Sequence, residues 1–220
     1  MDRELPIEQF PRLVRQAGLI HAFTQRVRGI DVTADKAEAL RRLDACHRET
    51  RRELGLGNVP FITAQQVHGN RVAVVDAAAN ADVCFDDCDG LVTNQTRVCL
   101  GIYVADCCAV YLVDPVRRVI GLVHSGKKGT ELGIAIKAID LMEERFGSRA
   151  ADLIVQLSPC IRPPHYEVDF AAEIVRAVKA RGVEHVDDCG TCTACDLEQY
   201  YSYRLEKGRT GRMLAVLAML

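Results

Sequence analysis

Apolar and polar residues alternate with the period of a β-strand near the middle of the chain. The alternation runs toward Asp114-Pro115, a turn signal, and apolar residues resume over positions 119–123. These two halves predict a β-hairpin. If its strands pair, Cys107 and His124 lie at matching ends and can face each other. A thiol beside an imidazole suits either a metal ion or a cysteine–histidine nucleophile.

A spacing of three or four between apolar residues predicts helices in three other segments. One runs from Thr33, its expected cap, to Leu54, a second covers residues 130–146, and a third has an apolar face over residues 170–178. Strand-like segments come in adjacent groups rather than in regular alternation with these helices. The pattern therefore favours an α+β fold with a mixed, largely antiparallel sheet over a doubly wound parallel fold. We expect one domain that spans residues 1–220.

Two further segments bear on the chemistry. Residues 61–76 have the pattern of two β segments interrupted at His68-Gly69-Asn70, which places His68 at a turn. Small and acidic residues over positions 77–89 indicate a surface loop before the next strands.

The composition narrows the class of partner. The chain has 28 basic and 30 acidic residues and a formal net charge of −2, which gives no reason to expect nucleic acid or an anionic membrane. Its N-terminal residues are acidic where a signal peptide would be basic, and no apolar run approaches the ~20 residues of a membrane span. We therefore expect a cytoplasmic protein whose partner is a small molecule. In that compartment its ten cysteines should be reduced.

Three residues that are far apart in the sequence are candidate metal ligands: His68, Cys107 and His124. Two imidazoles and a thiolate suit zinc, and three protein ligands leave a fourth position for water or substrate, as in catalytic zinc sites. Spacing alone leaves a structural role open for each of them, because free cysteines are often only small buried groups. Cys108 is expected to be such a group if the strand alternates.

Six motifs occur in order along most of the chain. They are QVHGNRV, DGLVTN, ADCCAVYLVDP, the His-Ser-Gly segment at 124–126, YEV at 166–168 and SYRLEKGRTGR. Over residues 21–212 this series resembles the laccase-domain family, also called multicopper polyphenol oxidase or YfiH-like. The resemblance implies a fold related to cysteine hydrolases such as the deamidase domain of cytotoxic necrotizing factor toxins. It also implies a zinc site formed by His68, Cys107 and His124.

The same resemblance implies chemistry on purine nucleosides. It points to phosphorolysis of adenosine, inosine, guanosine and methylthioadenosine and to deamination of adenosine, whereas earlier work on the family assigned copper-dependent oxidation of phenols. We therefore expect a zinc enzyme whose substrates are a purine nucleoside and phosphate. Zinc brings the pKa of a bound water toward about 7, which suits deamination of adenine. Asp106 is a candidate proton carrier beside the catalytic candidates Cys107 and His124.

Phosphorolysis also needs a phosphate held near the anomeric carbon. The sequence HSGKKGT leads from a strand into a helix, so Lys127, Lys128 and the helix N-terminus are candidates for binding an anion. A glycine-flanked turn with solvated lysines is the other interpretation. Arg26, Arg204 and Arg212 are further candidates for phosphate or ribose, although lone arginines more often form surface ion pairs.

Two positions depart from the family pattern. Lys127-Lys128 stand where most members have Trp-Arg, so base stacking and bidentate phosphate binding are not assured. His165 stands where the usual residue before YEV is cysteine. It can supply an extra metal ligand or an acid–base group, or it can simply pack beside Pro163-Pro164.

Cys189, Cys192 and Cys195 form two adjacent C-x-x-C units. An iron–sulfur cluster is not expected, because a ferredoxin-like run needs a fourth cysteine followed by proline. The candidates for the fourth ligand of a structural zinc are Cys84, Cys88 and Cys160. We favour thiols or an adventitious disulfide over a second metal here.

The sequence suggests three alternative functions. The first, a copper-dependent phenol oxidase, has little support, because a multicopper oxidase needs many histidines for its trinuclear cluster and this chain has six. A metal-free hydrolase or deamidase would use Cys107 and His124 directly. A catalytically silent metal-binding or interaction protein is the third alternative. No motif sets the assembly state, and a homodimer is kept open.

Overall fold

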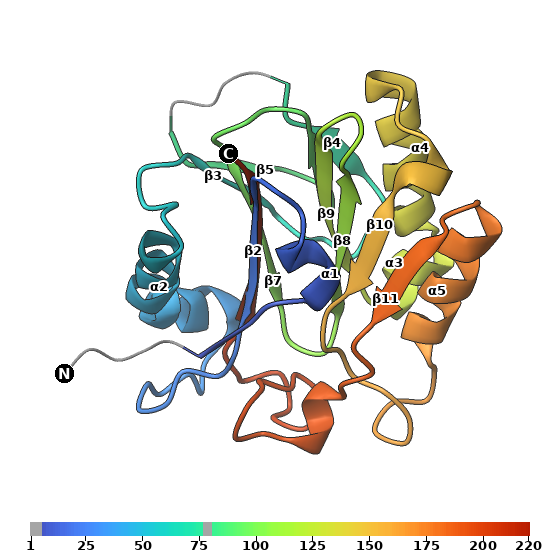
Figure 1. The fold of residues 1–220 in the computed structure, drawn as a ribbon. Helices are drawn as coiled ribbons and strands as arrows, with labels where there is room; N and C mark the ends of the chain where they lie inside the picture. Colours follow the sequence, from blue (N-terminus) through green and yellow to red (C-terminus); the bar gives the residue numbers. More distant parts are fainter. Residues whose placement is uncertain (1–5, 77–80) are drawn as a thin grey trace.

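The computed structural model describes residues 6–76 and 81–220, which form two six-stranded sheets with a shared core (Figure 1). The strands of the first sheet are β1 (Ile7–Glu8), β2 (Leu19–Thr24), β3 (Phe61–Ala64), β5 (Val83–Phe85), β7 (Cys99–Val104) and β12 (Met213–Met219). Those of the second are β4 (Val72–Val74), β6 (Gly90–Thr93), β8 (Cys108–Asp114), β9 (Val119–Ser125), β10 (Ile154–Leu157) and β11 (His185–Asp188). The strand orders are β1-β2-β12-β7-β3-β5 and β11-β10-β8-β9-β6-β4. The predicted α+β class is confirmed, but two mixed sheets replace the single expected sheet.

The long helices lie on the outer sides of the two sheets, whereas the short first helix lies between the sheets (Figure 1). In chain order the helices are α1 (Pro11–Val14), α2 (Lys36–Glu53), α3 (Lys127–Glu131), α4 (Ile134–Phe146) and α5 (Phe170–Ala180), and the short 3-10 turns are η1 (Ala150–Asp152) and η2 (Thr193–Cys195). α2 flanks the first sheet, where the His47 ring lies 5.4 Å from that of Tyr103, and α4 and α5 cover the second sheet. In the described parts of the chain, no helix combines the length and apolar character needed to cross a bilayer.

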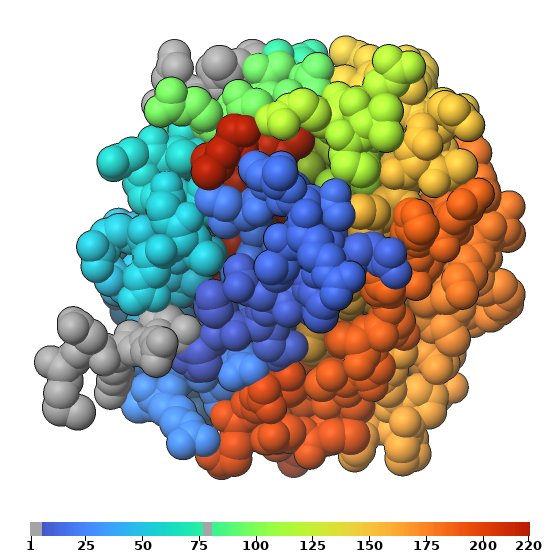
Figure 2. Space-filling model, in the orientation of Figure 1, coloured from blue at the N-terminus to red at the C-terminus, as the bar shows by residue number. Residues whose placement is uncertain are grey.

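One apolar cluster fills the space between the two sheets. Its members include Phe23, Leu100 and Ile102 of the first sheet and Tyr111, Ile120 and Leu122 of the second. The Tyr111 hydroxyl donates a hydrogen bond to the Ala22 carbonyl at 2.8 Å, so this buried side chain joins both sheets. The N-terminal residues, blue in Figure 2, pack across the front of the molecule, and Leu13 of α1 is fully buried there.

The predicted hairpin is confirmed. β8 and β9 pair antiparallel from Cys108 opposite Ser125 to Asp114 opposite Val119. The carboxylate of Asp114 accepts hydrogen bonds from two backbone N–H groups of the turn, both at 2.9 Å. These bonds explain why Asp114-Pro115 correctly predicts a turn. Both strands are buried along their whole length, because the first sheet covers one face of the hairpin and helices cover the other.

The β segments on either side of His68 also form, but they belong to different sheets. β3 pairs parallel with β7 in the first sheet, and β4 pairs parallel with β6 in the second. The connection therefore crosses from one sheet to the other. Its backbone is left-handed at Gln66 (φ 65°) and His68 (φ 60°), a conformation that side chains rarely adopt.

Two helix boundaries differ from the prediction. α2 begins after Asp35, whose carboxylate accepts the Glu38 N–H at 2.9 Å, and Thr33 is not the cap. The helix expected over residues 130–146 is divided into α3 and α4 by Gly133, which is left-handed (φ 71°). This break changes the direction of the apolar stripe, so Leu132 is 43% exposed.

Four strands were not expected from the sequence, and the first of them is β1 at the edge of the first sheet. β5 lies within the segment predicted as a surface loop over residues 77–89, of which residues 77–80 lie outside the described residues. β11 is a short polar strand at a sheet edge. β12 is a central strand that is apolar on both faces, so it lacks the alternation that marks a half-buried strand.

Gly101 of β7 gives a test of the side-chain packing between β7 and its neighbour β3 within the first sheet. A Cβ at this position would lie 2.2 Å from Cε2 of Phe61. We expect Gly101→Ala to lower the free energy of unfolding by about 1–3 kcal/mol, the usual cost of overpacking, as measured by urea denaturation. The loss should be smaller when Phe61 is also changed to Leu. Equal losses in both backgrounds would show that the ring is not the cause.

Candidate metal centre

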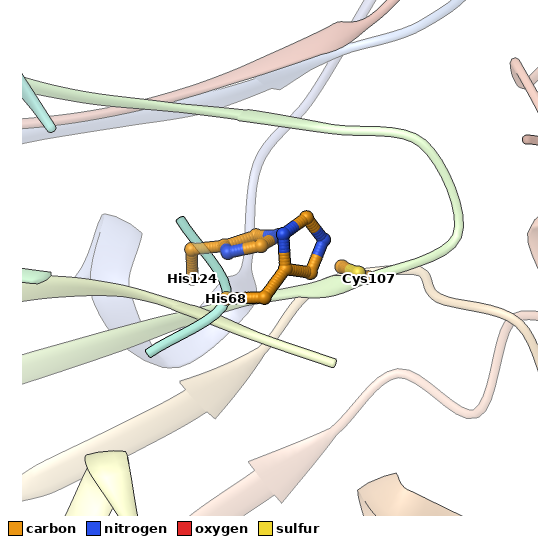
Figure 3. A group of neighbouring side chains, drawn as sticks. All are labelled: His68, Cys107 and His124. Carbon is orange, nitrogen blue, oxygen red and sulfur yellow. The ribbon is translucent and has the colours of Figure 1, made fainter. Parts of the chain in front are cut away.

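Three segments bring His68, Cys107 and His124 together where the chain crosses between the sheets. Their ligating atoms all lie within 4.8 Å of one another, and Figure 3 shows the sulfur beside the two rings. The imidazole planes meet at 82° with centroids 4.8 Å apart. His124 is buried, Cys107 is half-buried and His68 is exposed. The group is therefore accessible from the side of His68.

The hairpin positions two of these side chains. His124 of β9 pairs with Ala109 of β8. Because side chains alternate along a strand, Cys107 shares a face with Ala109 and is directed toward His124. Asp106, just before Cys107, has a left-handed backbone (φ 78°) that turns the chain into β8. Cys108 points the other way and is fully buried, as expected.

Asp89 fixes the orientation of the two histidines. Its carboxylate lies 2.9 Å from Nδ1 of His124 and accepts the backbone N–H groups of His68 and Gly69, both at 2.8 Å. Burial alone would raise the pKa of Asp89, but the hydrogen bonds from His124 and from these N–H groups hold it below its usual value. The ionised carboxylate requires His124 to carry its proton on Nδ1, which leaves Nε2 for a ligand.

Cys107 and His124 form a coupled pair. Burial alone would raise the pKa of the thiol, but the charge and hydrogen bond of His124 bring it down to about 6. Burial would also lower the pKa of His124, yet the Cys107 charge and the Asp89 hydrogen bond raise it to about 9. A thiolate is thus favoured near neutral pH, which is the form that binds metal or attacks a carbon.

Gly126 has no side chain, and the Cys107 sulfur fills the space that one would take. A Cβ on this glycine would lie 2.6 Å from Cys107 Sγ, a contact that real Cβ atoms do not make. The His-Ser-Gly segment therefore has glycine because the sulfur packs directly against its backbone. Any larger residue would push the thiol away from the two histidines.

The donor set fits a metal ion. Two imidazoles and one thiolate are the borderline ligands that zinc prefers, and copper accepts them too. Three protein ligands leave one coordination position for a small molecule. In addition, a buried carboxylate holds one imidazole, as is usual for metal-ligating histidines.

Asp106 is directed away from the three ligands. Its carboxylate accepts hydrogen bonds from Thr193 Oγ1 at 2.8 Å, Ser202 Oγ at 3.0 Å and the Arg204 N–H at 2.7 Å. Burial raises its pKa although these hydrogen bonds oppose the change. The contacts fit a residue that positions Cys107, and a role as proton carrier stays a prediction.

Two of the predicted anion-binding arginines have acidic partners. Arg26 is 2.7 Å from Glu206 and its guanidinium lies 4.4 Å from the Tyr201 ring centroid. Arg204 pairs with Glu167 at 3.1 Å. Both side chains therefore already have an anion beside them, which leaves less charge for a substrate.

The charge of Cys107 acts on Arg212 and on a second cation, Lys36, which was not a candidate from the sequence. Burial lowers the pKa of both groups, and the charge of Cys107 acts on both in the opposite sense. Arg212 is 7% exposed and donates to the carbonyls of Thr210 and Gly211. Lys36 is half-buried and donates to the Gln65 carbonyl at 3.1 Å. Its positive charge and that of the buried Arg212 repel each other, so an anion between them would be stabilised.

Lys127 and Lys128 lie in the first turn of α3. Lys127 is 3.8 Å from Glu167, and Lys128 is exposed. Since α3 has five residues, the long helix whose N-terminus was expected to hold an anion does not start here. The two lysines themselves stay candidates.

His165 belongs to a second group. Its Nδ1 lies 3.7 Å from Cys192 Sγ and 3.6 Å from Cys195 Sγ. Among the described residues, neither metal-compatible group includes Cys189 or the three cysteines proposed as a fourth ligand, Cys84, Cys88 and Cys160. The cysteine cluster therefore joins a histidine rather than another cysteine.

Sequence reasoning missed three residues of the metal centre: Asp89, Gly126 and Lys36. Asp89 opens DGLVTN and Gly126 ends His-Ser-Gly, so the motifs contained the signal but no role was assigned. Lys36 begins an amphipathic helix among many charged residues, and nothing in its local sequence distinguishes it.

Asp89→Asn should lower zinc affinity about 10–100-fold, because the amide can no longer hold His124 as the carboxylate does. Competition with a chromogenic chelator measures this change. The matched control is Asp114→Asn, which alters an equally buried carboxylate that accepts two N–H groups in the β8–β9 turn. The control should lose stability but keep its zinc affinity. Equal affinity losses would assign the effect to general unfolding.

Comparisons with known proteins identify relatives of this chain and solved structures with the same fold. A purine nucleoside phosphorylase of Deinococcus radiodurans is 31% identical over 98% of this chain and 93% of its own length. The purine nucleoside phosphorylase YlmD of Bacillus subtilis is 27% identical over 72% of this chain and 70% of its own. Bacillus licheniformis YfiH, a solved structure, has a TM-score of 0.81 at 21% identity over 92% of this chain and 93% of its own, which shows the fold.

The family described as multi-copper polyphenol oxidoreductase laccase matches residues 14–181 and 168–220. These two matches together include the metal centre and both sheets' central strands. The chain therefore belongs to the multi-copper polyphenol oxidoreductase laccase family.

Proposed function

We propose that this protein is a zinc-dependent purine nucleoside phosphorylase that also deaminates adenosine. The proposal rests on the group of His68, Cys107 and His124, whose charge acts on two cations, the half-buried Lys36 and the buried Arg212. A metal centre next to an anion site suits a reaction between a neutral nucleoside and phosphate. Relatives named purine nucleoside phosphorylase, one of which matches 98% of this chain, support the same activity.

His68, Cys107 and His124 would hold the zinc ion, which supplies Lewis acidity beside the substrate. Asp89 keeps His124 in the orientation that this requires. Each metal ligand comes from a different segment, so correct packing of both sheets is needed before the centre can form.

Arg212 and Lys36 would bind phosphate. Burial makes their positive charges costly, and a phosphate dianion offsets that cost. Arg212 already has Nη1 directed at two carbonyls, which fixes the guanidinium plane. Tyr203 is 55% exposed with its ring centroid 5.8 Å from the Arg212 guanidinium, so it offers an aromatic face for a purine that Lys127-Lys128 cannot.

A metal-free cysteine hydrolase is the second candidate function. Cys107, His124 and Asp89 form a thiol–imidazole–carboxylate series in which the thiol pKa is about 6. This is the arrangement of an activated nucleophile, base and orienting carboxylate. Such an enzyme would be inhibited by iodoacetamide and would keep its activity after metal removal.

A copper-dependent phenol oxidase has less support from the arrangement of histidines. His21 accepts the Phe10 N–H at 2.7 Å, and His47 is buried against Tyr103. These two of the six histidines therefore lie in the core rather than at the centre, and too few remain for a trinuclear cluster.

The zinc-loaded protein should convert adenosine and phosphate to adenine and ribose 1-phosphate, with some inosine formed whether or not phosphate is present. Cys107→Ala and His124→Ala should each lower both activities by more than the ~10–100-fold typical of residues that only orient a ligand. Chromatography of the products measures both reactions. Activity that survives chelation but not iodoacetamide would favour the hydrolase, and full activity in both variants would reject the site.

Arg212→Gln should raise the KM for phosphate about 10–100-fold, because a charge-assisted hydrogen bond contributes ~1.5–3 kcal/mol. The KM for adenosine in the deamination assay should change less. Arg26→Gln is the control, since its guanidinium is paired with Glu206. If both variants raised the KM for phosphate equally, the anion would not be bound at Arg212.

A further inference from the structure

We propose that His165, Cys192 and Cys195 form a second zinc site, separate from the metal centre, that holds two loops beneath Cys107. This inference does not depend on the proposed activity. The three ligating atoms lie within 4.8 Å of one another in the structure. Two thiolates and one imidazole balance the charge of Zn²⁺, and this three-ligand set occurs in zinc proteins with the fourth position open to water.

The distances agree with tetrahedral coordination. With Zn–S of about 2.3 Å and Zn–N of about 2.0 Å, the nitrogen and each sulfur of a tetrahedral site lie about 3.5 Å apart. The distances from His165 Nδ1 are 3.7 Å to Cys192 Sγ and 3.6 Å to Cys195 Sγ. The sulfurs and the ring therefore need little movement to coordinate one ion.

The backbone holds the ligands in place without a metal. Cys192 and Cys195 are three residues apart across η2, where the Cys195 N–H donates to the Cys192 carbonyl at 3.1 Å, and C-x-x-C pairs of this kind bind zinc in many proteins. Cys160 and Cys192 form an isolated parallel bridge that joins this turn to the segment containing His165. The His165 N–H donates to the Arg162 carbonyl at 2.9 Å.

The three side chains leave a fourth coordination position that is open to solvent. His165 and Cys192 are half-buried, whereas Cys195 is exposed, so solvent can complete the coordination. Cys189, the other cysteine of the cluster, is exposed and lies outside the group. It therefore provides a control within the same loop.

Both loops of the second site reach Asp106, the residue before Cys107. Thr193, which lies between the two cysteines, donates from Oγ1 to the Asp106 carboxylate at 2.8 Å. Ile161, on the segment that leads to His165, donates its N–H to the Asp106 carbonyl at 2.8 Å. A metal ion that joins the loops would therefore keep the turn before Cys107 in its observed conformation.

The test measures zinc bound per chain in the full-length protein after chelation, reduction and reconstitution, by plasma mass spectrometry. The wild type should bind two equivalents. Cys195→Ser and His165→Ala should each lose one equivalent, and Cys107→Ala should also retain one because it affects only the metal centre. Cys189→Ser should keep both. His165→Cys should restore two equivalents, since a thiolate replaces the imidazole.

Cobalt identifies which residues hold the remaining ion. In the Cys107→Ala background, bound Co²⁺ should show a thiolate charge-transfer absorption, which Cys195→Ser should remove and Cys189→Ser should leave. Zinc should also protect Cys192 and Cys195 from iodoacetamide. The proposal is overturned if Cys107→Ala binds no metal, or if the reduced cysteines react at the same rate with and without zinc. A Cys192–Cys195 disulfide that takes up no zinc after reduction would overturn it as well.

Discussion

The buried carboxylate of Asp89 is the constraint on which the metal centre depends. It is fully shielded from solvent, and a buried carboxylate without hydrogen bonds would cost several kcal/mol. Four groups provide these hydrogen bonds: the backbone N–H groups of three successive residues, Val67, His68 and Gly69, and the ring of His124. The Asp89 carbonyl also accepts the His124 N–H at 2.7 Å. The hydrogen bonds of one acidic side chain therefore place two of the three candidate metal ligands.

The same region contains unusual backbone conformations. Gln66, His68 and Asp106 all have positive φ angles although none is glycine. Each such residue costs of the order of 1 kcal/mol and persists only where surrounding contacts enforce it. Gln66 provides one of these contacts, because its side-chain amide exchanges two hydrogen bonds with the Tyr103 backbone at 2.6 and 3.0 Å. The chain thus accepts local strain where it crosses from one sheet to the other and aims its ligands inward.

Local features of the sequence were predictable, and long-range pairings were not. The β8–β9 hairpin and α2 follow from periodicity and from turn chemistry that a few neighbouring residues decide. The division into two sheets arises because β3 pairs with β7 whereas β4 pairs with β6. The periodicity of each segment does not determine which strand it pairs with. The same limit applies to the sites. Cys107 and His124 share a hairpin and could be paired from it, whereas Asp89 acquires its role only through tertiary contacts.

The two cysteine–histidine groups differ in their surroundings, and this difference divides their roles. At the candidate metal centre the charge of Cys107 acts on both Lys36 and Arg212, so an anionic substrate would gain binding energy there. The second group adjoins Arg162, whose carbonyl faces Cys192 and whose guanidinium is 2.9 Å from Asp188. That arginine's charge is already balanced, which leaves little attraction for phosphate beside the second group. The proposed substrate chemistry therefore fits the first group, and a metal at the second group would act by holding the chain around it.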